Sequence, residues 1–150
     1  MPTRLWPIAL IIALLASCAT ASTPKHNTLS IDYLTLLALS REGEDLSQET
    51  AWCLIGSTTD SIVQVDGIAA PYIQERSDST VIFSNCARHK GLVGWYHNHP
   101  RGAFDNCAAS EGDITTTNEW PDFKIAIISC NGDSFLYWFQ GDTVRYRILP

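Results

Sequence analysis

The sequence predicts an α+β or three-layer fold built on a mixed β-sheet. Two segments with helical spacing stand among seven short segments typical of strands. Asn131-Gly132 and Gly141-Asp142 supply hairpin turns between the last three strands. Residues 29–150, with the ordinary 45% apolar content of the whole chain, are enough for a single globular domain.

The first half of this domain begins with a predicted helix and continues with strands. A helix is expected over residues 29–40, because Ile31, Leu34 and Leu37 recur at helical spacing. Residues 42–45 form a turn rich in acidic residues. Apolar and β-branched runs then predict strands at residues 50–57, 61–65 and 80–84.

The second half places a short helix between strands. Residues 92–99 are apolar and aromatic and read as a strand, which Pro100 ends because it lacks an N–H. A short helix over 110–118 follows, and Ser110-x-x-Asp113 has the form of a capping box at its start. The last predicted strands are residues 123–129, 134–140 and 143–148.

Two histidines on the predicted strand 92–99 suggest a metal site. Side chains alternate between the faces of a strand, so His97 and His99 share one face, with Cα atoms about 6–7 Å apart. Asp113 follows at the start of the predicted helix and could supply a carboxylate. Catalytic zinc uses three protein ligands of these types and keeps a fourth position open. Separately, the histidine pair and the capping box are weak signals, but their adjacency favours a zinc site.

The order His97-Asn98-His99-Pro100, a loop, then Ser110-x-x-Asp113 resembles the JAMM motif of the MPN-plus (JAB-domain) metalloprotease family. The segment from Glu49 to Gly56 is similar to the family's apolar segment that follows its catalytic glutamate. The resemblance spans residues 29–150 and implies an MPN/JAB-like, cytidine-deaminase-like fold, a curved mixed sheet flanked by helices. One departure is the loop after Pro100, which is longer than the family's.

The resemblance implies a chemical role for each residue of the motif. His97, His99 and Asp113 would bind Zn²⁺, Glu49 would act as general base, and Ser110 would stabilise an oxyanion. The implied activity is hydrolysis of peptide or isopeptide bonds. A catalytically inactive MPN-like binding or scaffold module is the alternative, and a zinc-binding lipoprotein is a weaker third.

The beginning of the chain predicts export. Arg4 precedes an apolar run that is short for a membrane span and typical of a signal peptide. The stretch ending at Cys18 resembles a bacterial lipobox, so residues 1–18 are expected to be a signal peptide with lipidation at Cys18. Residues 19–28 would form a tether. Cleavage after Ala21, giving a soluble periplasmic or secreted protein, stays open.

Four cysteines remain after Cys18, an even number that suits an oxidising compartment. Sequence alone allows three pairings among Cys53, Cys86, Cys107 and Cys130. By the family resemblance, the strand 123–129 runs parallel to the strand 92–99. That arrangement favours a Cys107–Cys130 disulfide near the site, with Cys53 and Cys86 either paired or free and Cys86–Cys107 as the runner-up.

The net charge of −6 argues against nucleic acid as a partner. The expected partners are a peptide, protein or peptidoglycan-peptide substrate, and a membrane reached through the lipid anchor. The expected location is the bacterial cell envelope, with the protein on the outer membrane facing the periplasm.

Overall fold

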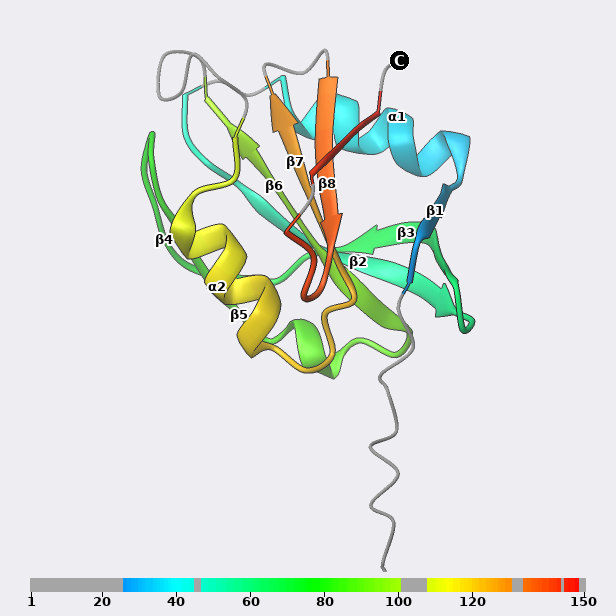
Figure 1. Cartoon of the computed structure of the whole chain (residues 1–150). Helices are drawn as coiled ribbons and strands as arrows, with labels where there is room; N and C mark the ends of the chain where they lie inside the picture. The colour runs from blue at the N-terminus through cyan, green and yellow to red at the C-terminus, as the bar shows by residue number, and fades with distance from the viewer. Residues whose placement is uncertain (1–25, 45–46, 101–107, 131–133, 144, 149–150) are drawn as a thin grey trace, which may run out of the picture.

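A mixed seven-stranded sheet forms the centre of the molecule, with helix α1 on one face and α2 on the other (Figure 1). The computed structural model describes residues 26–44, 47–100, 108–130, 134–143 and 145–148. The strands follow one another across the sheet in the order β1-β3-β2-β6-β7-β8-β9. Strands β4 and β5 pair with each other as a separate two-stranded sheet. The predicted α+β class and mixed sheet are therefore confirmed.

The elements have the following bounds in chain order. The main-sheet strands are β1 (Thr28–Ile31), β2 (Ala51–Thr58), β3 (Ile62–Ala69), β6 (Leu92–His99), β7 (Ile125–Cys130), β8 (Ser134–Phe139) and β9 (Tyr146–Ile148). The hairpin strands are β4 (Tyr72–Arg76) and β5 (Val81–Ser84). The helices are α1 (Tyr33–Glu42), α2 (Glu111–Glu119) and the short 3₁₀ turn η1 (Cys86–Arg88).

The apolar core is divided between the two faces of the sheet. On the α1 face, Leu39 packs with alternate residues of the central strands, and the Tyr96 hydroxyl donates to the Leu39 carbonyl over 2.9 Å. On the α2 face, Trp95 packs with Phe123, and its indole N–H donates to the Thr117 hydroxyl over 3.0 Å. Because helices cover both faces, β6 and β7 carry apolar side chains in both directions, which is why they read as continuous buried strands.

Strand β6 lies in the middle of the sheet and carries the histidines. It pairs antiparallel with β2, with Ala51 opposite His97, and parallel with β7, with His99 opposite Cys130. A Cβ on Gly94 would lie 2.0 Å from the Ile125 carbonyl oxygen, so only glycine permits this close approach of β6 to β7. The parallel pairing that the family resemblance implied for these two strands is confirmed.

Two strands were not predicted, and the first helix was placed too early. Residues 28–31, most of which we assigned to a helix, form β1 alongside β3, and α1 begins only after Asp32, whose carboxylate accepts from the Thr35 N–H. Strand β4 lies between the predicted strands 61–65 and 80–84, where the sequence analysis predicted no strand or helix. No helix within the described residues is long and apolar enough to cross a membrane.

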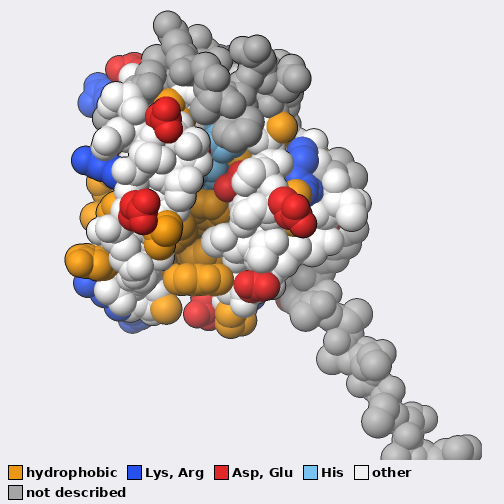
Figure 2. Space-filling view, turned by 90° about the vertical axis from the view of Figure 1, so that its left-hand side faces the viewer, with side chains coloured by type: hydrophobic (Ala, Val, Ile, Leu, Met, Phe, Trp, Pro, Cys, Tyr) orange, Lys and Arg blue, Asp and Glu red, His pale blue; other side chains and the backbone are white. Residues whose placement is uncertain are grey.

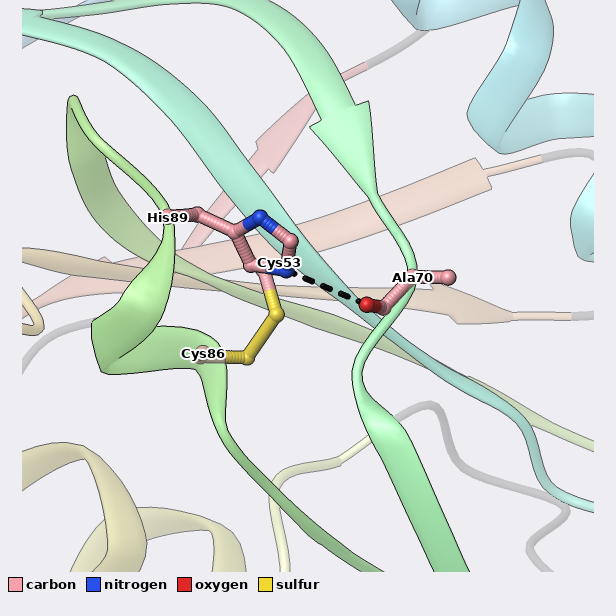
Figure 3. The surroundings of a disulfide bond; sticks show 4 residues. All are labelled: Cys53, Ala70, Cys86 and His89. Carbon is pink, nitrogen blue, oxygen red and sulfur yellow. Dashed lines mark hydrogen bonds between the residues drawn. A yellow bond between two sulfur atoms is a disulfide. The ribbon is translucent and has the colours of Figure 1, made fainter.

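A disulfide joins Cys53 of β2 to Cys86 of η1 (Figure 3). Both cysteines are fully buried, and nearby the His89 Nε2 lies 3.1 Å from the Ala70 carbonyl oxygen. The bond fastens the chain that follows the β4–β5 hairpin to the central sheet. It also rules out the Cys86–Cys107 alternative. Cys130 is disulfide-bonded as well, but Cys107 lies outside the described residues, so its pairing with Cys130 stays a prediction.

We expect loss of the Cys53–Cys86 bond to destabilise the domain. The bond closes a loop across a sequence separation of 33, and the chain-entropy model assigns such a loop about 3–4 kcal/mol. The Cys53→Ala/Cys86→Ala double variant should lose about that much of the free energy of unfolding, measured by urea denaturation. An unfolding free energy equal to that of the wild type would contradict this.

Candidate metal centre

Three side chains from two elements converge at the end of β6. The Nε2 atoms of His97 and His99 lie 2.9 Å apart. The Asp113 carboxylate places Oδ1 3.2 Å from the His97 Nε2 and Oδ2 3.7 Å from the His99 Nε2. The sequence prediction that these three residues come together is therefore met.

Helix α2 brings Asp113 to the histidines through its capping box. Ser110 is the N-cap, and its hydroxyl oxygen accepts from the Asp113 N–H over 3.1 Å. In return, the Ser110 N–H donates to the Asp113 Oδ2 over 2.7 Å. The two bonds fix the direction of the carboxylate, so a residue in the first turn of α2 is aimed at the imidazoles. Helix capping and metal binding are thus compatible roles for Asp113.

The indole ring of Trp95 stacks on the imidazole of His97 and holds it in place. The Trp95 ring lies parallel to the His97 ring, with centroids 4.6 Å apart and an interplanar angle of 7°. Both residues lie on the α2 face of β6, two positions apart. Since His97 is almost fully buried, its ring has little freedom to turn away from the converging atoms.

The donor set suits zinc in chemistry and in spacing. Zinc bonds of about 2.0–2.1 Å at tetrahedral angles place ligand atoms about 3.3–3.4 Å apart, close to the separations observed here. Imidazole nitrogens and carboxylate oxygens are the usual ligands of catalytic zinc. Together His97, His99 and Asp113 form a possible metal-binding group whose ligand atoms all lie within 4.8 Å of one another.

Glu49 lies beside this group, just before β2. Its side chain is only 5% exposed, and it lines the same cavity as His99, Ser110 and Asp113. The Glu49 N–H donates to the Ser77 carbonyl over 2.6 Å. This bond holds the backbone of Glu49 against the turn of the β4–β5 hairpin. Glu49 is thus a buried carboxylate that is not one of the three converging ligands. Such a group is suited to proton transfer.

The two carboxylates have opposite electrostatic environments. Burial raises the pKa of Glu49, although the neighbouring His97 and His99 oppose the shift. Burial also acts to raise the pKa of Asp113, but hydrogen bonds with His97, His99 and the Ser110 N–H outweigh it and hold that pKa well below the ordinary range. Asp113 therefore stays anionic, as a ligand must, while Glu49 can exchange a proton more readily.

A cavity of about 240 Å³ opens beside the metal group. Figure 2 shows a hollow with a hydrophobic floor and histidine side chains at its upper end. One wall comes from the β4–β5 hairpin and the other from α2 (Figure 1). The hairpin residues in the lining are Ser79, Thr80, Val81 and Phe83.

The sequence did not indicate the hairpin wall of the cavity, since no motif residue lies there. Trp95, which also lines the cavity, could have been found from the alternation that places it on the same face of β6 as both histidines. The structure thus brings together all five residues of the motif and adds an apolar floor. Cys18 and Cys107 lie outside the described residues.

Comparison with known proteins gives likenesses among solved structures alone. No family model matches the sequence, and no curated protein does. A solved structure described as JAMM, a metalloprotease-like zinc site in the proteasome and signalosome, is similar at a TM-score of 0.47 and 18% identity. The match covers 79% of this chain and 94% of that one.

Proposed function

We propose that this protein is a zinc-dependent hydrolase of peptide or isopeptide bonds. The observation that supports it most directly is the placement of Glu49, a buried carboxylate outside the three-residue metal group yet lining the same cavity. A site that only stores zinc has no need of an additional buried acid beside an open cavity.

The chemistry can be assigned by residue. A zinc ion held by His97, His99 and Asp113 would lower the pKa of a water molecule and polarise a carbonyl group. Glu49 accepts a proton from the attacking water and passes it to the leaving amine. The Ser110 hydroxyl accepts from the Asp113 N–H, so its own proton is available to an oxyanion that develops in the cavity.

The lining of the cavity suits a peptide-like substrate. Its lining combines apolar side chains with the hydroxyls of Ser79, Thr80 and Thr116, which suits a peptide with both apolar and polar groups. Protein, peptide and peptidoglycan-peptide substrates all fall within this class.

The test of this function is metal analysis followed by a substrate screen. The purified chain should bind one zinc ion and cleave members of a library of peptides, isopeptide-linked peptides and peptidoglycan peptides. A chelator should abolish the cleavage, and added zinc should restore it. Stoichiometric zinc without cleavage of any library member would favour a binding or scaffold role instead.

We further propose that the protein works in the bacterial envelope, anchored by a lipid at Cys18. The sequence before Cys18 and the polar stretch after it support this proposal. Wild-type cells grown with labelled fatty acid should yield labelled protein, and Cys18→Ser should yield unlabelled protein that is released or unprocessed. Absence of label in the wild type would count against the anchor.

A further inference from the structure

Asn98 lies between the two histidines on β6 and contacts the segment that carries Glu49. Its side chain points to the opposite face from those of His97 and His99, as alternation along a strand requires. The residue is fully buried. The role of the histidine pair does not explain a buried amide at this position.

The Asn98 amide bridges the peptide groups on both sides of Glu49. Its Oδ1 accepts from the Thr50 N–H over 2.6 Å, and its Nδ2 donates to the Gln48 carbonyl over 3.3 Å. The Asn98 backbone N–H adds a bond of 3.3 Å to the Thr50 carbonyl. One residue therefore makes three hydrogen bonds to the residues that flank Glu49.

These bonds matter because Glu49 lies outside the regular ladder. The pairing of β2 with β6 ends at Ala51 and His97, and residues 47–50 belong to neither a helix nor a strand. Continuing the same register would place Glu49 opposite His99, on the face where Asp113 arrives. The Asn98 side chain extends the contact between the strands by one more residue, and its amide supplies the acceptor and the donor on two separate atoms, as this geometry uses.

We propose that Asn98 is a positioning residue that holds Glu49 in place beside the metal group. This inference depends on the role of Glu49 in the proposed function. A site of this kind requires its acid–base group to be held within about 0.5 Å of the productive geometry. Because Asn98 sits between two of the metal ligands, it links the placement of Glu49 directly to the strand that carries them.

The competing explanation is that Asn98 merely satisfies buried peptide groups and stabilises the sheet. The exchange rate of the Glu49 amide distinguishes the two explanations, because this N–H donates to the Ser77 carbonyl and not to Asn98. Replacing Asn98 leaves that acceptor intact. Faster exchange of the Glu49 amide would therefore mean that Glu49 itself has lost its fixed position.

The experiment is amide hydrogen exchange, followed by NMR, on the zinc-loaded wild type and Asn98→Ala. We expect the Thr50 and Glu49 amides to exchange about two- to tenfold faster in the variant, as the loss of single hydrogen bonds implies. Amides of Cys53 and Leu54 within β2, and the zinc content, should be unchanged. An unchanged Glu49 amide, or faster exchange throughout β2, would overturn the proposal.

The matched control is Ser129→Ala. Ser129 is also a fully buried polar residue, paired with Asn98 across β6 and β7. Its substitution should leave the Glu49 and Thr50 amides unchanged. If Asn98→Ala does not fold, Asn98→Thr serves for the same measurements, because threonine favours strands but is too short to bridge both peptide groups.

A double-mutant cycle adds a readout on catalysis. With a substrate from the library screen, Asn98→Ala should lower kcat with little change in KM. Combined with Glu49→Gln it should cause little further loss, since Asn98 acts through Glu49. Independent, additive losses would overturn the proposal. If the wild type cleaves nothing, the proposed function fails, whereas the exchange measurement still decides whether Asn98 positions Glu49.

Discussion

Replacing both His97 and His99 with alanine is expected to abolish stoichiometric zinc binding. The two imidazoles supply two of the three ligand atoms that converge at the end of β6. Asp113 would remain as a single carboxylate, which is too few ligands for a site of this type. Metal analysis of the purified double variant after zinc loading and dialysis should find much less than one ion per chain.

The double variant must be compared with a histidine change elsewhere. His89 is a suitable control, because it lies near the Cys53–Cys86 disulfide and contacts the Ala70 carbonyl, not the metal group (Figure 3). His89→Ala should keep a full zinc ion. Far-UV circular dichroism should show that the double variant still folds. A folded double variant that retains full zinc would show that the metal binds elsewhere in the chain.

The sequence was sufficient to predict that His97, His99 and Asp113 come together, because much of that geometry is local. Alternation along one strand places His97 and His99 on the same face, and the Ser110 capping box both begins α2 and orients Asp113. What the spacing could not give is the position of α2 against the face of the sheet that carries Trp95. That arrangement depends on packing of Trp95 against Thr117 and Phe123.

The missed elements depend on contacts that are distant in sequence. Residues 28–31 carry apolar side chains at positions that also suit a helix, and β1 is stabilised by parallel pairing with β3. The Asp32 N-cap was a visible signal for the later helix start. Strand β4 is mostly exposed and pairs only with β5, so it has little of the apolar pattern by which strands are recognised.

For Glu49, the sequence predicted the residue but not its environment. The family resemblance pointed to Glu49, but the contacts around it were not visible in the motif. The Glu49 N–H donates to the Ser77 carbonyl of the β4–β5 hairpin, and the next N–H, of Thr50, donates to the Asn98 side chain. A glutamate before a strand is usually exposed. Only the assembled sheet shows that this one is removed from water and faces the metal group.

Glu49→Gln is therefore expected to abolish most hydrolysis while keeping zinc and fold. The glutamine amide has nearly the same shape as the carboxylate, so packing should not change. Glu49 is not one of the three possible metal ligands, so the zinc content should not change either. The amide cannot accept a proton from the attacking water or deliver one to the leaving amine. General acid–base catalysis contributes about 10²–10⁴-fold, and kcat on a substrate from the library screen should fall by that order.

The matched control is Glu111→Gln, which makes the same chemical change on an exposed residue in the first turn of α2. It removes one negative charge near the site without touching a buried carboxylate, so its kcat should stay close to that of the wild type. Burial raises the pKa of Glu49, which means that the folded protein already opposes its negative charge. Removing that charge should therefore leave the free energy of unfolding of the zinc-free protein unchanged or slightly higher. A Glu49→Gln variant with full zinc and undiminished turnover would show that another group transfers the proton.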